Sequence, residues 1–519
     1  MTPLLVLWSM AVSVAAVGTW VLFDGAWGIN AAVWTVTAAV GLLLCVRRSG
    51  GSISAPLGVA LGLAVLLAAG TAVTTDAAFH GWIILAVLVL FAIGTRLAAD
   101  GRADGMGAVF MASAPGVAVG RGLVEVERRV TESIASLSTD RSRPWVRGAV
   151  IALPVVVLFA LLLADADPLF AAIRHSLRET LADWNFLPRV GFFATLLTAA
   201  LGAGGLALRG AAPAVYPLRR VAQRLGLTER LIVLVAVTLL FAVFLLLQLS
   251  YLFGNAPAVS GSGVTFAEYA RRGFNELTIV ATLCALLVIA LDGRARGGDG
   301  ERAVRVVAIA LVAETLLLLV SAFRRVWLYE TAYGFTTTRL YAQAYMILIA
   351  STLALLAWEI ERGLDPKRLA RRAAALAGLS FASLIYWNHE AWIVRVNVAR
   401  ARGTGTLDAT YLVRGLSPDA LPALVEAQAS APEALALPLR QALRERYGSV
   451  RVRPCFWFEA NVRQRQAVRA LKGRGWELTP VPFGTGASHL KRSPREVVGP
   501  RGFEPLAFGF VARRSVHLS

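Results

Sequence analysis

The chain has 519 residues, of which 57% are hydrophobic and only 16% are charged, and its mean hydropathy is +0.62. A soluble protein would carry about a quarter charged residues, so this composition excludes a simple cytosolic enzyme and indicates a multi-pass membrane protein. The net charge is +19, and the basic excess is almost entirely arginine because only three lysines occur. Two cysteines, Cys45 and Cys284, fall in apolar segments and Cys455 in a polar tail, so no disulfide framework is predicted.

Apolar runs long enough to cross a bilayer, which takes about 20 residues, occur ten times. They lie at about 4–23, 27–46, 56–75, 77–97, 146–164, 189–208, 230–253, 274–291, 303–321 and 339–358. An eleventh run at 372–387 is shorter, but Asp365-Pro366 ahead of it supplies an N-cap and a first-turn proline. The predicted fold class is an all-α polytopic membrane helix bundle of about eleven transmembrane helices, with a small C-terminal extramembrane α or α+β domain.

These runs divide the chain into four predicted parts. Residues 1–98 form an N-terminal four-helix membrane segment, 99–145 a cytoplasmic loop with an amphipathic helix, 146–387 a bundle of seven helices and 388–519 a tail domain. In the loop, apolar side chains recur every three or four residues, with acids and arginines between them. These apolar residues are Val119, Leu123, Val126, Val130, Ile134 and Leu137. We expect this helix to pack under the bundle rather than to sense anionic lipid.

The tail is predicted to begin with amphipathic helices over 388–447, one of which starts at Ser417-Pro418-Asp419. After residue 448 the glycine and proline content rises. Val450–Arg453, Phe456–Phe458 and Phe508–Phe510 are candidate short strands.

The distribution of arginine and lysine predicts the orientation, because basic loops resist translocation. One alternate set of loops and span ends carries 24 basic residues and the other carries 8. The richer set should be cytoplasmic, which places the N-terminus inside. After eleven crossings the tail from about residue 388 is extracytoplasmic, whereas ten crossings would leave it in the cytoplasm. The predicted location is therefore a bacterial inner membrane with an external tail.

Several motifs carry a resemblance to a known family. They are Tyr251-Leu-Phe-Gly254, Glu268 to Glu276, Arg325-Val-Trp-Leu-Tyr329, Tyr333 to Arg339, Asn388 to Ile393, Asn397 to Arg400, Leu407 to Leu412 and Leu416 to Pro422. Over about residues 145–425 the sequence resembles bacterial polytopic membrane proteins catalogued as domain of unknown function 4173 and its 4153 relatives. At one motif His389-Glu390 stands where that family usually has Pro-Asp. The resemblance implies a membrane bundle and brings no activity and no catalytic residue.

Ionisable groups within apolar segments are functional-site hypotheses, because a charge is expensive in a bilayer. Glu314 lies deep in the ninth span, and Ser321 and Arg325 follow on nearly the same helical face, which we expect to look into the bundle. It is an intramembrane acid, with proton coupling as the alternative to a buried polar partner.

Before and within the eighth span, Glu268, Arg272 and Glu276 are spaced four residues apart, so one arginine can bridge two carboxylates. Further ionisable groups gather at the predicted outer span ends. They are Asp165, Asp167, Arg271, Arg324, Arg325, Glu330 and Arg339.

Two interpretations of the outer groups stay open. They either pair with one another and fix helix ends, or form a shallow ligand site for an anionic head group or sugar phosphate, whose oxygens suit the guanidinium fork. Residues 322–339 contain three arginines and one acid, a local excess of +2 that favours an anion. We therefore predict a site formed by Arg324, Arg325, Arg339 and Tyr329, with Glu268, Arg272 and Glu276 beside it.

Two functions from different classes follow. The favoured one is a non-enzymatic cell-envelope component for transport, sensing or assembly, whose partners are the lipid bilayer and an anionic lipid or envelope polymer. The alternative is a polyprenyl-phosphate-sugar-dependent membrane glycosyltransferase with Asp165 and Asp167 as catalytic acids, which a deep cavity reaching both would favour. The five histidines are scattered, so no metal site is predicted, and neither a cofactor nor a nucleic-acid partner is expected.

Overall fold

The computed structural model of the chain describes residues 3–100, 107–137, 186–209, 227–253, 274–291, 299–448, 450–452, 457–473 and 478–480. Ten of its helices coincide with predicted spans. They are α1 (Pro3–Leu22), α2 (Asn30–Arg48), α3 (Ala55–Ala69), α4 (Ala77–Asp100), α8 (Phe186–Arg209), α9 (Leu227–Phe253), α12 (Phe274–Leu291), α13 (Asp299–Tyr333), α14 (Thr337–Glu361) and α15 (Pro366–Tyr386), with a 3-10 turn, η1 (Gly70–Ala72), closing α3. The predicted span 146–164 lies outside the described residues.

Nine helices of the described ranges are long and apolar enough to cross a membrane: α1 to α4, α8, α9, α13, α14 and the additional helix α5 (Ala108–Leu137). The all-α bundle and the lipid-bilayer setting are thereby confirmed. The chain is a multi-pass membrane protein.

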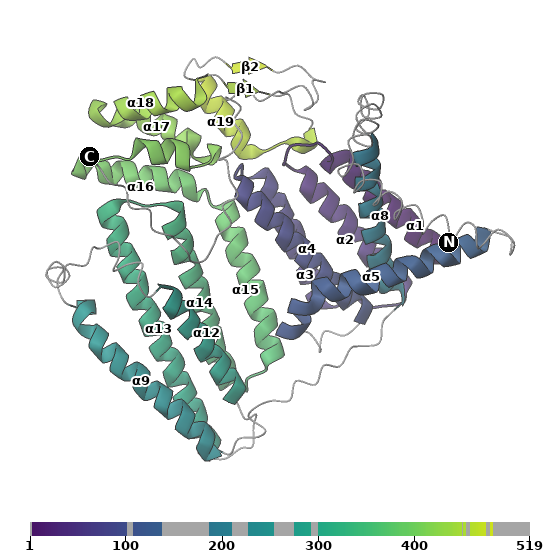
Figure 1. Cartoon of the computed structure of the whole chain (residues 1–519), viewed down its shortest axis with the longest axis horizontal. Coiled ribbons are helices and arrows are strands. Elements are labelled where there is room, and N and C mark those ends of the chain that lie inside the picture. The colour runs from purple at the N-terminus through teal and green to yellow at the C-terminus, as the bar shows by residue number, and fades with distance from the viewer. Residues whose placement is uncertain are drawn as a thin grey trace, which may run out of the picture.

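The membrane helices form two groups joined by α15 (Figure 1). The first group contains α1 to α4 and α8, whose core includes Leu7, Leu42 and Leu61. The second contains α9, α12, α13 and α14 around Leu311 and Leu356. Helix α15 packs against α14 on one side and against α3 on the other, and its Ile385 contributes to a third apolar cluster.

The two ends of the bundle differ in composition. At one end, which we call the basic end, exposed arginines stand at the ends of helices: Arg47, Arg48, Arg209, Arg302, Arg305 and Arg362. At the other end exposed aromatic side chains gather: Trp20, Trp82, Trp327, Tyr333 and Trp387. Tryptophan and tyrosine favour membrane–water interfaces, so this ring marks a bilayer boundary.

Helix α5 crosses the N-terminal helices at a steep angle rather than running alongside them (Figure 1). Near its start Phe110 contacts Arg96 of α4, and near its end Ser133 accepts a hydrogen bond from Trp8 of α1 at 2.9 Å. Arg96 and Trp8 both belong to the basic end, so both ends of α5 contact this end of the bundle. At the crossing with α8, Gly122 and Gly202 let the two backbones approach closely.

Helix α5 turns both apolar and charged side chains toward the protein. Val119 and Leu123 are largely accessible but line an apolar cavity between the N-terminal helices, and Val126 packs against their core. Glu125 is buried and pairs with Arg128 and Arg129 of its own helix, and Arg209 at the end of α8 contacts the same carboxylate at 3.5 Å. The buried charge of Glu125 is the feature that the apolar periodicity does not predict.

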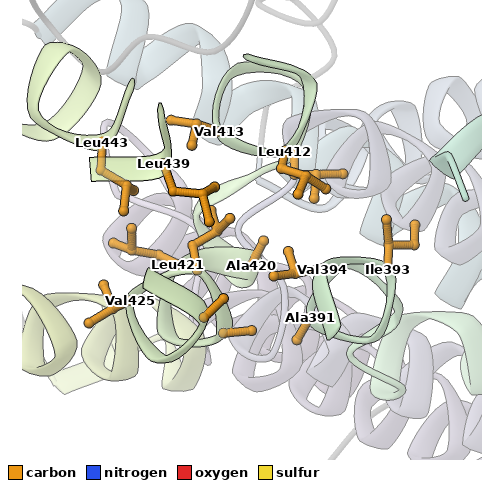
Figure 2. Close-up of a cluster of buried hydrophobic side chains, with 14 of the residues drawn as sticks. Ala391, Ile393, Val394, Leu412, Val413, Ala420, Leu421, Val425, Leu439 and Leu443 are labelled. Atoms are coloured by element: carbon orange, nitrogen blue, oxygen red, sulfur yellow. The ribbon is translucent and has the colours of Figure 1, made fainter. Parts of the chain in front are cut away.

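The C-terminal residues form a helical unit, here called the platform, at the aromatic end of the bundle. It consists of α16 (His389–Thr404), the π-helical turn η4 (Tyr411–Gly415), the 3-10 turn η5 (Pro418–Ala420), α17 (Leu421–Ser430), α18 (Glu433–Tyr447), the 3-10 turn η6 (Trp457–Glu459) and α19 (Val462–Lys472). Figure 2 shows its core, in which Val394 of α16, Leu421 of α17 and Leu439 of α18 point toward one another. The platform is thus a packed unit with its own apolar centre.

Strand β1 (Val450–Val452) pairs in parallel with β2 (Leu478–Pro480), with Val450 opposite Leu478. The first predicted strand is therefore confirmed. The second is wrong at Trp457 and Phe458, which form a 3-10 turn held by the contact of Phe458 with Trp20 and by a hydrogen bond from the Ala26 amide to Glu459, whereas residue 456 lies outside the described residues. The third, at 508–510, lies outside the described residues.

Candidate functional site

The densest buried polar cluster of the described residues lies where the platform meets the loop between α3 and α4. Its centre is Asp419 of η5. The Thr74 hydroxyl donates to Asp419 Oδ2 at 2.8 Å, and the Thr75 amide and hydroxyl donate to Oδ1 at 2.9 and 2.5 Å. Arg463 of α19 completes the shell with Nη1 at 2.8 Å from Oδ2, and the two charged side chains are only 6% and 2% exposed. We call this cluster the junction.

Local sequence positions each side chain of the junction. Ser417 accepts a hydrogen bond from the Asp419 amide at 3.2 Å and Pro418 begins the turn, so the carboxylate faces the bundle. Asn461 caps α19 through the Gln464 amide at 3.0 Å, and its own amide donates to the Thr71 and Thr74 carbonyls at 2.9 and 2.7 Å. One capping residue thus both starts a platform helix and binds the membrane loop.

Glu390, at the start of α16, extends the junction. The Ser417 amide donates to both of its oxygens at 3.1 and 3.0 Å, and the Ser417 hydroxyl donates to one of them. Burial raises the pKa of Glu390 to about 7, and the nearby charges of Asp419 and Asp76 act in the same direction, while the Ser417 hydrogen bonds oppose them. The carboxyl is therefore poised to change its charge near neutral pH.

His389 precedes Glu390 and contacts Tyr341 of α14, with 2.9 Å between Nε2 and the phenol oxygen. Burial lowers the pKa of His389, so its imidazole is neutral at pH 7. The residues that depart from the related family's usual Pro-Asp pair thus occupy the contact between platform and bundle. No local pattern in the sequence assigns a chemical role to His389, Glu390 or Asp419.

A second polar group surrounds the turn between α13 and α14, at Gly334. The guanidinium of Arg339 lies 4.1 Å from the centre of the Tyr329 ring and donates to the Gly334 carbonyl. Glu330 is fully buried and accepts a hydrogen bond from Gln343 at 2.6 Å. The structure therefore brings two of the predicted site residues, Arg339 and Tyr329, into contact.

Arg324 and Arg325 lie on α13 before this turn, the first exposed and the second half-buried, and each has an interaction partner. Their convergence on one anion stays a prediction. The other predicted site residues give no test: Asp165, Asp167, Glu268, Arg271 and Arg272 lie outside the described residues, and Glu276 falls in the first turn of α12.

Glu314 lies in the middle of α13 and is half-buried. Its Oε2 is shielded from solvent and has no hydrogen-bond partner. Ser321 is buried, whereas Arg325 is half-buried, so the predicted inward face is only partly inward. Glu314 marks the border between the packed and the outer side of the helix.

Other membrane-helix acids pair with arginine near the basic end. Glu359 of α14 is fully buried and binds Arg368 and Arg372 of α15, and Glu301 binds Arg230 at 2.5 Å. These ion pairs join neighbouring helices near their ends, which is the structural role that buried acids can have without a ligand. Among the described residues no group of three or more His, Cys, Asp or Glu could hold a metal ion.

A cavity of about 540 Å³ lies between α1, α2, α4, α5 and α8. Its walls are mostly apolar, with Met10, Trp34 and Phe91 among them and few polar groups such as Thr95 and Thr198. None of its lining residues belongs to the junction or to the Gly334 turn, so the cavity and the polar groups are separate features.

The comparisons with known proteins place the chain in a family. The model described as "Domain of unknown function (DUF4153)" matches residues 61–427, which begin inside α3 and end inside α17. The match thus starts well before residue 145, where the motif resemblance begins, and it includes Glu390 and Asp419. No curated protein and no solved structure matches the chain. Because the matched region is well over half of its length, the protein belongs to the DUF4153 family.

Proposed function

We propose that this protein is a non-enzymatic component of the bacterial cell envelope, for transport, sensing or assembly, that binds an anionic group at the platform end of its bundle. The observation that carries the proposal is Arg339, whose guanidinium is stacked on Tyr329 beside the Gly334 turn. A guanidinium held in this way is presented to a ligand at little cost in side-chain freedom. Phosphate and carboxylate oxygens match its fork.

The setting supports an anionic lipid as the ligand. Trp327 and Tyr333 on the same stretch of α13 are exposed and mark the level of lipid head groups. Residues 322–339 carry three arginines and one acid, Glu330, which accepts a hydrogen bond from Gln343 and has the charge of Arg339 nearby. Positive charge at this level attracts anionic head groups. In the proposed site Arg324 and Arg325 join Arg339 and Tyr329 around the ligand, with Glu268, Arg272 and Glu276 beside it.

The orientation belongs to the same proposal. The exposed arginines of the basic end favour the cytoplasm, which supports an extracytoplasmic side for the platform and the Arg339 site. Nothing in the described residues favours the glycosyltransferase alternative, whose candidate acids Asp165 and Asp167 lie outside them.

Native mass spectrometry of the full chain tests the site with a matched pair of variants. Arg339 stacks on Tyr329 at one end of the bundle, and Arg362 stacks on Trp358 at the other, with 4.1 and 4.4 Å between guanidinium and ring centre. Arg339→Ala should lose co-purifying anionic lipid, whereas Arg362→Ala should retain it. The same bound lipid in wild type and Arg339→Ala, or none in either, would reject the proposal.

A further inference from the structure

Glu314 lies in the middle of the apolar part of α13. The exposed arginines Arg305 and Arg324 stand nine residues before it and ten residues after it on the same continuous helix. At a rise of about 1.5 Å per residue the two arginines are about 28 Å apart, close to the roughly 30 Å thickness of a hydrocarbon core. They mark the two boundaries of the core, and Glu314 is midway between them.

One carboxylate oxygen of Glu314 has no hydrogen-bond partner, and the described residues place no cation beside it. Its Oε2 is shielded from solvent without a hydrogen-bond partner. The hydroxyl of the adjacent Thr315 hydrogen-bonds to the Leu311 carbonyl at 2.8 Å and to the Cys284 sulfur at 3.1 Å, so it does not bind Glu314. On the other described membrane helices the buried acids Asp100, Glu125 and Glu359 each pair with arginine. Glu314 therefore differs in kind from the acids that fix helix ends.

Among the described helices, α9, α12 and α14 pack most extensively against α13. Cys284 of α12 is the described titratable group that faces Glu314 at this depth. The other titratable side chains described on these three helices, such as Arg230 and Glu359, lie toward helix ends. No arginine or lysine among them is placed to neutralise a carboxylate at residue 314.

We propose that Glu314 is a proton-binding site in the middle of the membrane. A carboxylate at this position would be an uncompensated charge in hydrocarbon, with one oxygen lacking any donor. Taking up one proton forms one O–H bond and removes the charge, so the neutral acid is the resting form. Release of the proton requires water or a cation to reach the site. This site is independent of the anion site proposed above.

Carbodiimide labelling of the full chain in lipid nanodiscs tests this directly. Dicyclohexylcarbodiimide partitions into hydrocarbon and adds to protonated carboxyl groups: the acid proton goes to a reagent nitrogen and the carboxyl oxygen to its central carbon. The adduct keeps the whole mass of the reagent and is located by peptide mass spectrometry. We expect an adduct on Glu314 at neutral pH. We expect none on Glu359, which is fully buried but is paired with two arginines.

Infrared spectroscopy provides the second measurement. The carbonyl stretching band of a protonated carboxyl should be present in wild type and in Glu445→Gln, an exposed control on the platform, and reduced in Glu314→Gln. Labelling of wild type needs no variant, so the proposal stays testable if Glu314→Gln fails to fold. An unlabelled Glu314, or equal labelling of Glu314 and Glu359, would overturn it.

Discussion

Two arginine–acid pairs of the platform show how burial determines the contribution of an ion pair to stability. Arg463–Asp419 and Arg414–Glu445 are both 2.8 Å apart. The side chains of the first pair are 6% and 2% exposed, and those of the second are 60% and 47% exposed. Water screens the exposed pair, whereas removal of one buried partner leaves the other charge stranded.

Asp419→Asn should therefore loosen the platform. We expect a loss of about 3–5 kcal/mol in the stability of the docked platform, because Arg463 would remain buried without its carboxylate. Glu445→Gln should cost at most about 1 kcal/mol. Hydrogen–deuterium exchange of α16 to α19 in the full chain measures both. Similar exchange in the two variants would contradict the role given to burial.

The sequence indicates only half of this junction. Ser417-Pro418-Asp419 is recognisable as a helical start from its residue types alone, and η5 confirms it. Its partners Thr74 and Thr75 lie 345 and 344 residues away in what reads as an ordinary connecting loop. A single sequence carries no local pattern that pairs such distant residues, because their meeting depends on how the complete bundle packs.

At the scale of elements, the membrane helices were predictable because hydropathy over about 20 residues reflects the thickness of the bilayer. The burial of Glu125 in α5 was not. Helical periodicity selects the apolar residues of this helix, of which Val119 and Leu123 line the cavity, but it does not show that a charged side chain can also be buried. Glu125 is buried together with ion pairs to Arg128 and Arg129 of its own helix and to Arg209 of α8. The last of these pairs depends on how the complete bundle packs.

Two glycines at helix ends provide an element-scale test. Gly334 and Gly363 have φ of +87° and +77°, a region that disfavours side chains by about 1–2 kcal/mol. A Cβ on Gly334 would lie 2.7 Å from Asn397 Oδ1, whereas one on Gly363 would meet nothing within 4 Å. Gly334→Ala should thus lose about 1–3 kcal/mol more than Gly363→Ala through overpacking. Thermal unfolding in detergent measures the difference. Equal decreases in unfolding temperature for the two variants would show that the Asn397 side chain can move aside without loss of stability.

For the whole molecule, the structure separates the start of the chain from the platform. Helix α1 begins beside Ser133 at the basic end, through Trp8, and finishes at the aromatic end, where Trp20 contacts Phe458. The two therefore lie at opposite ends of the bundle. This arrangement agrees with an odd number of crossings, as the sequence analysis favours.

Reporter fusions test the side of the membrane. A phosphatase that is active only outside the cytoplasm, fused after Ser519, should be active in a bacterial host, and a fluorescent protein that folds only in the cytoplasm should be dark there. Fusions at the N-terminus serve as the control and should behave in the opposite way. A fluorescent C-terminal fusion would place the platform in the cytoplasm and reverse the proposed orientation.

The hydrogen bond between Thr74 and Asp419 joins residues 345 positions apart in the chain, which imposes an order on biogenesis. At a synthesis rate of about 5–20 residues per second, Asp419 leaves the ribosome roughly 20 to 70 seconds after Thr74. During that interval the carbonyls of Thr71 and Thr74, which Asn461 later binds, must be hydrated. The junction can therefore close only late, after the helices between Thr74 and Asp419 have been synthesised. A nascent chain cut short before α19 would lack Asn461, and the carbonyls of Thr71 and Thr74 would stay without this partner.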